Sequence, residues 1–549
     1  MKKFAFLFLL LAITVGLMVG CSNPPNNTTK RPRLVVSIVV DQMRADYLDR
    51  YYPHFEEGGF RRLMERGYQF RNAHYPYMPT YTAPGHASVA TGATPEVHGI
   101  IGNHWYDKRA GEVVYCVSDS TAESVGSNTP AGKMSPFQLL VPTLGDAMRL
   151  HWQLESKTIG ISIKDRSAIL SAGHTGNGAY WLDGSTGDFV TSTWYKEELP
   201  AWVQAFNDSG LVDHYLSGPW ELRDPIERYL SSDVDDSPYE GKPSGKDRPT
   251  FPYDLPALLP TNGYGMIGYT PFGNQIVVDM AKAAVLSEGL GQDDIPDLLA
   301  ISFSATDKIG HRYGTQALET EDTYARLDQS IAELLVFLDR EIGPHNYVLT
   351  LTADHGGAMV PAYLRDLSIP AGYFKADSLK TTLRSALEEK WGDEGIFKAF
   401  GNEQVFLDHE KIQQLGLTKK VVQDFIERIL MDFPGVGYVL TDEEMFSGHF
   451  LNPIIQRVQR GYHPLRSGDM AVVLLPGWMQ YGPVGTSHGS PYAYDTHVPI
   501  IFYGAGIESG KTARPVDVTQ IAPTLSSLLQ MAAPHGATGI PLIELTDKK

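Results

Sequence analysis

Cysteine is almost absent from this chain, since only Cys21 and Cys116 occur among its 549 residues. Because Cys21 ends an N-terminal apolar stretch and is expected to carry a lipid, no intramolecular disulfide is available in an oxidising compartment. Cys116 is then expected to be a small buried apolar residue. With so few thiols, a metal centre in this chain has to use oxygen and nitrogen donors.

Basic residues are scarce relative to acidic ones. The chain has 46 Lys and Arg against 64 Asp and Glu, which gives a formal net charge of −18. This balance argues against binding of nucleic-acid polymers through bulk electrostatics. An anionic substrate would have to be attracted by cations placed locally at its site.

The N-terminus has the pattern of an export signal. Lys2 and Lys3 precede an apolar stretch from Phe4 to Val19, which is short for a membrane span. Small residues followed by Cys21 resemble the bacterial lipoprotein cleavage box, with an ordinary signal peptide as the alternative. We expect a signal peptide at 1–20 and a flexible Pro-rich tether at 21–32. The protein is therefore predicted to be exported in a Gram-negative bacterium, periplasmic or outer-membrane-anchored, with the Cys21 lipid as its only membrane attachment.

The remainder, 33–549, is predicted to be a single α/β catalytic domain without internal repeats. Apolar runs rich in β-branched residues are typical of strands buried on both faces. Amphipathic helical patterns lie between several of them, clearest at Gln275–Glu288 and Glu321–Ile342, and a terminal helix is expected at Asp517–Met531. This alternation predicts a three-layer α/β/α sandwich with a mostly parallel central sheet. The runs are Leu34–Val40, Lys157–Ile163, Asp297–Phe303, Tyr347–Thr352, Met470–Leu475 and Val498–Phe502.

Two segments interrupt the alternation and are predicted to be insertions. The first, at about 176–272, has a hairpin pattern followed by a Pro-, Gly- and Asp-rich stretch, and we expect it to be a cap. The second, at about 357–480, carries predicted helices at Leu379–Trp391 and Lys419–Met431 and strands of its own. We expect both to shape access to the site.

Most candidate site residues follow a predicted strand. Asp41 follows the first run directly, and Asp354 and His355 follow the run at Tyr347–Thr352 and precede two glycines. Open α/β sheets bind ligands at the carboxyl ends of their strands. Asp41 alone is weak evidence, because helix N-caps have the same appearance.

Further metal-ligand types occur in two other places. Asp307 and His311 are spaced i, i+4, which brings both to one side of a helical turn, and His488 lies between glycines. Carboxylate and imidazole donors without thiolates favour zinc over manganese or iron. The six residues divide into two sets of three, so two zinc ions are the expected cofactors.

Thr82 is the candidate nucleophile. Pro84 favours a helix start at this point, and a hydroxyl at a helix N-terminus lies beside backbone N–H groups that also bind phosphate oxygens. A plain N-cap role is the alternative for Thr82. From spacing alone, Thr80 competes with it.

The segment Thr82-Ala83-Pro84-Gly85-His86, the Asp and His pairs and His488-Gly489 resemble the alkaline phosphatase superfamily. The similarity is to its threonine-nucleophile branch, which contains PafA-type phosphate monoesterases and nucleotide pyrophosphatase/phosphodiesterases. It spans the chain from Leu34 onward. The resemblance implies an alkaline phosphatase-like fold and favours Thr82 over Thr80, with a covalent phosphothreonine intermediate. It groups Asp307, His311 and His488 on one zinc, and Asp41, Asp354 and His355 on the other, beside Thr82.

The resemblance also separates substrate classes. Asn103 matches the family's phosphate-contacting asparagine, and Lys164 and Arg166 stand where PafA-type enzymes grip the transferred phosphate. Spacing alone makes such a K-x-R pair uninformative, although it shares one face of an extended segment. Two fixed cations suit a dianionic monoester, with Arg166 able to bind in a fork geometry. The diesterase branch lacks this pair.

The expected function is hydrolysis of small-molecule phosphate monoesters, with no obligate protein partner. A phosphodiesterase or nucleotide pyrophosphatase on the same fold is the alternative. Sulfatase activity is disfavoured because no Cys-x-Pro-x-Arg segment is found. A non-catalytic lipid-anchored binding protein is a remote alternative, since such a protein should have lost one or more of the ligands, and none is missing.

Overall fold

The computed structural model describes residues 31–547. The predicted signal peptide, the predicted lipidation site Cys21 and most of the predicted tether lie outside the described residues. Among residues 31–547, no helix has both the length and the apolar character needed to cross a bilayer.

Four parallel strands form the centre of the main sheet. β1 (Leu34–Val40) lies between β10 (Tyr347–Thr352) and β9 (Asp297–Phe303). β6 (Thr158–Ser162) continues the sheet in parallel beyond β9. These segments are nearly free of exposed side chains, as expected for a sheet covered on both faces.

The sheet becomes mixed toward its edges. It has 11 strands, in the order β18-β2-β17-β10-β1-β9-β6-β7-β8-β5, with β19 paired to β2. The short edge strands are β5 (Ser124–Val125), β18 (Gly510–Thr512) and β19 (Val516–Asp517). β17 (His497–Gly504) is antiparallel to β10, and β2 (Tyr68–His74) is antiparallel to β17. The expectation of a mostly parallel central sheet is confirmed for its core strands.

The hairpin predicted for the first insertion belongs to this sheet. β7 (Gly178–Leu182) pairs in parallel with β6, and β8 (Phe189–Ser192) pairs antiparallel to β7. Both strands are largely buried. The turn predicted at Asp183-Gly184-Ser185 correctly indicated a hairpin, but local sequence does not reveal that the first strand of the hairpin has a parallel partner. The part of this segment that departs from the sheet begins after β8.

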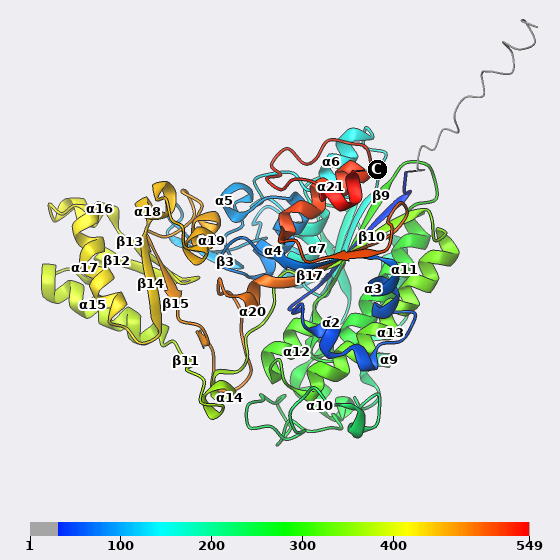
Figure 1. Ribbon diagram of the computed structural model, residues 1–549, viewed down its shortest axis with the longest axis horizontal. Coiled ribbons are helices and arrows are strands. Elements are labelled where there is room, and N and C mark those ends of the chain that lie inside the picture. The colour runs from blue at the N-terminus through cyan, green and yellow to red at the C-terminus, as the bar shows by residue number, and fades with distance from the viewer. Residues whose placement is uncertain (1–30, 548–549) are drawn as a thin grey trace, which may run out of the picture. The chain divides into compact units, whose positions relative to one another are not determined.

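Helices cover both faces of the sheet. Figure 1 shows α11 (Phe272–Glu288) and α13 (Leu318–Glu341) on one side, and α4 (Thr82–Thr91) and α7 (Asp165–Ala172) on the other. This is the predicted three-layer arrangement. The expected C-terminal helix is shorter than predicted: a 3₁₀ turn at Val518–Gln520 leads into α21 (Ile521–Leu528).

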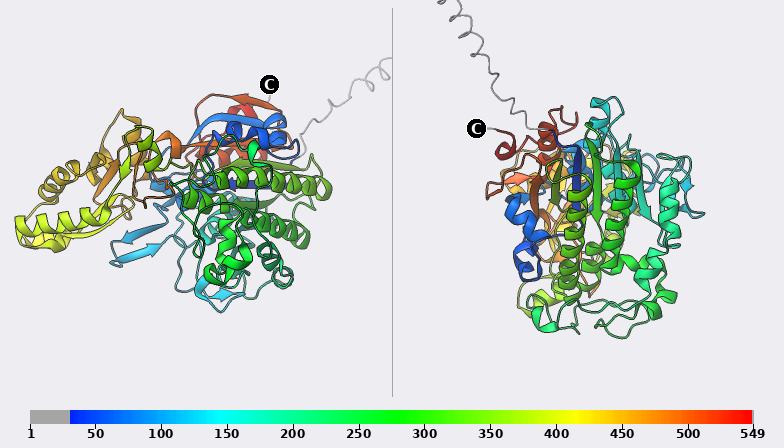
Figure 2. Two further views of the ribbon diagram at one scale, coloured as in Figure 1. Left: turned by 90° about the horizontal axis from the view of Figure 1, so that it is seen from below. Right: turned by 90° about the vertical axis from the view of Figure 1, so that its right-hand side faces the viewer.

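The second predicted insertion contains a module with its own core. A four-stranded sheet in the order β12-β13-β15-β14 packs against α15 (Ala376–Trp391) and α17 (Lys419–Met431), seen in yellow in Figure 2. The apolar run at Met470–Leu475 belongs to this small sheet, as β15 (Met470–Leu474). Its other strands are β12 (Phe397–Gly401), β13 (Gln404–Leu407) and β14 (Val436–Thr441).

We predict that the helical layer formed by α11 and α13 contributes strongly to stability. Leu334 on α13 is fully buried, so Leu334→Ala should cost about 2–5 kcal/mol by removing packed methyl groups. Leu286 on α11 is 59% exposed, and Leu286→Ala should cost less than about 0.5 kcal/mol. Thermal unfolding of both purified variants checks this, and equal melting temperatures would contradict it.

Candidate metal centre and active site

The structure brings the six predicted ligands together in two groups. Asp307, His311 and His488 form one, and Asp41, Asp354 and His355 form the other. Within each group, the potential ligand atoms lie within 4.8 Å of one another. We call these the Asp307 group and the Asp41 group. Their membership is the same as that implied by the family resemblance.

Strand order explains how distant residues meet. Asp41 follows β1, Asp354 follows β10, and Asp307 lies in α12 (Ala305–Tyr313), which starts after β9. Because β10, β1 and β9 are parallel neighbours, their carboxyl ends lie side by side. The Asp41 backbone N–H donates to the Phe303 carbonyl at 3.0 Å, which holds the first two strand ends together. His488 lies in the loop that follows the inserted module in the sequence.

The Asp41 group has the chemistry of a cation site. Asp41 Oδ1, Asp354 Oδ2 and His355 Nε2 are buried and have no hydrogen-bond partner. Burial and the neighbouring Asp41 charge hold the pKa of Asp354 well above its usual range. Burial lowers the pKa of His355 to about 3, so its imidazole is neutral, as a ligand must be. These donors fit a divalent metal ion.

The orientation of the three histidines supports the same assignment. Each places Nδ1 against a backbone carbonyl: His311 against Thr486 O (2.7 Å), His355 against Gly356 O (2.8 Å), and His488 against Thr80 O (2.7 Å). A carbonyl only accepts, so each ring carries its proton on Nδ1. The Nε2 atoms then face the carboxylates, 3.1–3.6 Å from Asp307 Oδ1 or Asp41 Oδ1, and that of His355 has no hydrogen-bond partner. Fixing the tautomer in this way is typical of metal-binding histidine.

Gln42 connects the two groups and was not identified from sequence. Its backbone N–H donates to Asp354 Oδ1 at 3.1 Å, and its side-chain amide donates to Asp307 Oδ1 at 2.9 Å. The residue is buried and has a left-handed backbone, with φ of 64°. Strain of this kind is concentrated at functional sites. Its position directly after Asp41 was the only available signal.

His86, for which no role was predicted from the sequence, lies inside the site. Its Nδ1 is 2.9 Å from Thr82 O and 3.4 Å from Asp354 Oδ2, and its Nε2 is 2.9 Å from Ser302 Oγ. Burial lowers its pKa to about 4. A neutral His86 that donates from Nδ1 to Thr82 O braces the first turn of α4.

Thr82 is the first residue of α4 and is almost fully buried. Asn103 lies beside it, with Oδ1 accepting from the Ala83 backbone N–H at 2.9 Å. The competing candidate, Thr80, lies outside the helix, and its hydroxyl donates to Ser490 O at 3.0 Å. Thr82 therefore lies at the N-terminus of α4, whereas the Thr80 hydroxyl is already hydrogen-bonded to the Ser490 carbonyl.

Lys164 lies where the two groups adjoin. Its buried Nζ is 2.7 Å from Asp41 Oδ2 and 2.5 Å from Asp307 Oδ2, one carboxylate of each group. Arg166 is not extended, as the sequence suggested, but lies in the first turn of α7, because Lys164 is the N-cap of that helix. Arg166 Nη1 is 3.2 Å from the Tyr115 hydroxyl, which donates to Asp165 at 2.5 Å. Its Nε has no partner.

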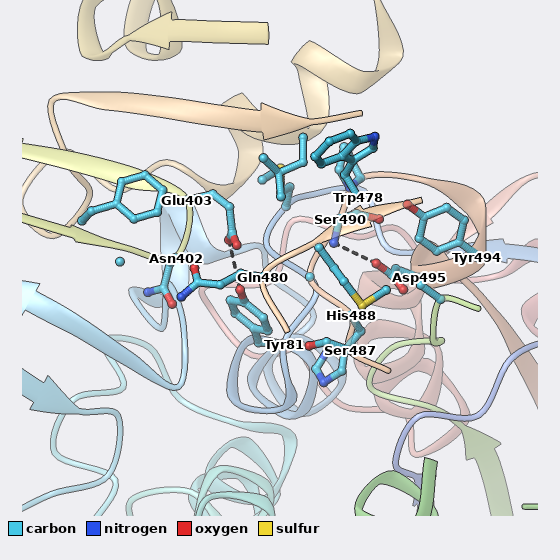
Figure 3. Close-up of a pocket in the computed structure, with 18 residues that line it drawn as sticks. Tyr81, Asn402, Glu403, Trp478, Gln480, Ser487, His488, Ser490, Tyr494 and Asp495 are labelled. Carbon is cyan, nitrogen blue, oxygen red and sulfur yellow. Dashed lines mark hydrogen bonds between the residues drawn. The ribbon is translucent and has the colours of Figure 1, made fainter. Parts of the chain in front are cut away.

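A cavity of about 280 Å³ opens beside the Asp307 group (Figure 3). His488 and Tyr81 line it from the main domain, and Asn402 and Glu403 line it from the turn between β12 and β13. The Tyr81 hydroxyl donates to Glu403 Oε2 at 3.0 Å, and burial raises the pKa of Glu403 to about 7. The inserted module thus supplies one wall of a pocket next to the site. None of the module residues that line this pocket was predicted from the sequence.

Comparison with known proteins gives concordant results. Alkaline phosphatase PafA of Elizabethkingia meningoseptica is 41% identical over 540 residues, which is 98% of each chain. A protein of Myroides odoratus named calcium-transporting ATPase is 41% identical over 523 residues, covering 94% of this chain and 95% of its own. A crystal structure of wild-type alkaline phosphatase PafA matches with a TM-score of 0.92 and 41% identity, covering 95% of this chain and 100% of that one.

The family model described as type I phosphodiesterase / nucleotide pyrophosphatase matches residues 35–492. That range contains all six residues of the two groups, together with Thr82, Asn103, Lys164 and Arg166. The chain belongs to the type I phosphodiesterase / nucleotide pyrophosphatase family.

Proposed function

We propose that this protein is an alkaline phosphatase that hydrolyses phosphate monoesters through a phosphothreonine intermediate. Similarity to alkaline phosphatase PafA over almost the whole chain supports the reaction class. The observation that supports a monoester substrate is the buried Lys164, which contacts a carboxylate of each group and is followed by Arg166. A family relative acting on diesters would have little use for two fixed cations there.

The two groups would hold two divalent metal ions, and zinc suits their carboxylate and imidazole donors. Bound there, the ions would supply positive charge that acidifies a hydroxyl and stabilises developing negative charge on oxygen. The Asp41 group is proposed to serve Thr82, and the Asp307 group to serve the leaving oxygen, next to the cavity lined by Tyr81 and Glu403.

Thr82 acts as the nucleophile in this proposal. Its Oγ forms a bond to phosphorus as the bond from phosphorus to the ester oxygen breaks, and the alcohol departs. A water molecule then attacks the phosphothreonine, releasing inorganic phosphate and regenerating the hydroxyl. The Thr82 backbone N–H at the start of α4 and the Asn103 side-chain NH₂ would donate to the non-bridging oxygens.

Lys164 and Arg166 would set the preference of the site for a doubly charged phosphoryl group. Two doubly charged metal ions are offset by three aspartates and an ionised Thr82, so the site without these two residues is near neutral. The two added cations then match the two negative charges of a monoester phosphoryl group. The terminal phosphoryl group of ATP presents similar charge, so the name of the Myroides odoratus relative is compatible with the same site.

We predict that Thr82→Ala lowers the rate of aryl phosphate hydrolysis by about 10³-fold or more, because it removes the attacking oxygen. Thr80→Ala is the matched control and should retain activity within about tenfold, because His488 bonds to the Thr80 backbone carbonyl, which alanine preserves. Steady-state kinetics and mass spectrometry of acid-quenched phosphorylated enzyme measure both. A Thr82→Ala enzyme with full activity would contradict the assigned nucleophile.

The monoester preference has a separate test. Lys164→Ala and Arg166→Ala should each lower kcat/KM for an aryl monoester by about 10²-fold or more, and much less for a diester, which carries one negative charge. Exposed Lys390→Ala on α15 is the control and should change neither rate. A panel of monoester, diester, ATP and sulfate ester gives the measurement. Equal losses for monoester and diester would favour the phosphodiesterase alternative instead.

Metal removal should abolish activity reversibly. The purified protein is expected to contain about two zinc ions, one for each group, and a chelator should remove both together with phosphatase activity. Restoration by zinc, and weaker restoration by manganese or iron, would support the assigned cofactor.

Asp354→Asn should lower the zinc content measured by plasma mass spectrometry, whereas unchanged zinc content would exclude the Asp41 group as a ligand set.

A further inference from the structure

The cavity beside the Asp307 group, which we call the Glu403 pocket, has an acidic lining. His488 lines it, so the pocket adjoins the group proposed to serve the leaving oxygen. Its volume of about 280 Å³ suits a small organic alcohol rather than a polymer. Among the described residues that line it, none is Lys or Arg, and two carry carboxylates, Glu403 and Asp495. The pocket therefore differs in charge from the cationic place assigned to the phosphoryl group.

Glu403 reaches the pocket from a tight turn of the inserted module. Asn402 and Glu403 join β12 to β13, and both have a left-handed backbone, with φ of 52° and 55°. Hairpin turns with positive φ at both positions favour Asn followed by Gly, because a Cβ atom is strained in this conformation. A glutamate in the second position is therefore unfavourable for the turn itself. Strained residues of this kind are concentrated at functional sites.

Both turn residues contact the main domain next to candidate catalytic residues. Asn402 Nδ2 donates to the His104 carbonyl at 2.5 Å, and His104 directly follows the candidate phosphate-contacting asparagine. The Tyr81 hydroxyl donates to Glu403 Oε2, and Tyr81 directly precedes the candidate nucleophile (Figure 3). These bonds fix the position of the glutamate relative to the site of phosphoryl transfer.

Asp495 is the second carboxylate of the pocket and is only 1% exposed. Its Oδ2 accepts from the Ser490 backbone N–H at 2.8 Å, whereas its Oδ1 is buried without a hydrogen-bond partner. A buried carboxylate oxygen that lacks a donor is costly unless something in the pocket supplies one.

No cation offsets these two carboxylates. In the described part of the chain, neither Glu403 nor Asp495 forms an ion pair. Arg44 pairs with Asp46 at 2.7 Å and does not line the pocket. Burial raises the pKa of Asp495 to about 7, although the charge of Arg44 opposes this rise, and burial also raises the pKa of Glu403 to about 7. Above this pH the pocket holds two negative charges.

Aromatic side chains form much of the remaining wall. The pocket is lined by Tyr81, Phe400, Trp478 and Tyr494. The face of an aromatic ring is negative, so it attracts ammonium groups. Aromatic rings beside carboxylates are a combination that recognises an organic cation and disfavours an organic anion.

We propose that the Glu403 pocket receives the alcohol part of the substrate, and that Glu403 and Asp495 select phosphate monoesters whose alcohol carries a protonated amine. This inference rests on the proposed function, because a leaving oxygen at the Asp307 group places the alcohol in this pocket. An ammonium group there offsets the two carboxylates, whereas an anionic alcohol adds a third negative charge. The phosphoryl group is recognised separately, by Lys164 and Arg166.

Two aryl phosphates of similar size test the inference, para-(aminomethyl)phenyl phosphate and para-carboxyphenyl phosphate. The unmutated protein should have a kcat/KM about tenfold or more higher for the aminomethyl ester. Glu403→Gln keeps the shape of the side chain and an oxygen that accepts from Tyr81, and it should lower this ratio of kcat/KM values by about tenfold. Because the two esters are compared between proteins, their different intrinsic reactivities cancel.

Three further variants separate charge from structure. Tyr81→Phe removes the hydrogen bond to Glu403 but leaves its charge, so the ratio should stay within about threefold. Glu389→Gln, an exposed change on α15 that removes the same charge, should alter neither the ratio nor the rates. Asp495→Asn should lower the ratio in the same direction as Glu403→Gln, and it provides the comparison if Glu403→Gln fails to fold.

The outcomes that contradict the inference differ from those that contradict the proposed function. An active enzyme that prefers the carboxyphenyl ester, or whose ratio is unchanged in both Glu403→Gln and Asp495→Asn, would overturn selection by charge and leave the phosphatase function in place. Equal losses of the ratio in Tyr81→Phe and Glu403→Gln would also overturn it, since Glu403 would then act by positioning Tyr81. A protein inactive towards every monoester would refute the proposed function, and the alcohol pocket with it.

Discussion

The repulsion among three buried aspartates is the constraint around which this structure is organised. Asp41, Asp307 and Asp354 are held at adjacent strand ends by the parallel order of β10, β1 and β9, in surroundings almost free of solvent. Carboxylates in such a place are tolerated only with cations beside them. Lys164 is one such cation, and the Nε2 atoms of the three histidines lie beside the same carboxylates, as in candidate metal sites. The chemistry of the site follows from the need to neutralise this charge.

Much of the fold and the membership of the site could be predicted from the sequence. The bounds of β1, β9, β10 and α17 agree with the expected runs because buried parallel strands and amphipathic helices have strong periodic patterns. The six ligand candidates were recognisable because they follow strands or stand between glycines. Their assignment to two groups came from family resemblance, and the ligand and catalytic roles stay predictions, as does the export signal.

Other features could not have been read from local sequence. Gln42 and His86 act through contacts with residues more than two hundred positions away, at Asp307, Asp354 and Ser302, and neither amide nor lone imidazole has a distinctive pattern. β7 was placed in a cap because hairpin signals do not specify which sheet receives the strand. The Glu403 pocket depends on the docking of a separately folded module, a relation between distant segments that no periodicity encodes.

The bond from His488 to the carbonyl of Thr80 has a mechanical consequence. A single short stretch of backbone orients an imidazole of the Asp307 group and, two residues later, carries the hydroxyl at the start of α4. Movement of that stretch would shift both together, so their spacing is conserved when the surrounding loops flex. The Thr80 side chain is buried and donates to Ser490 O, and a change in the path of the Thr80 peptide would disturb the Asp307 group and the start of α4 at once.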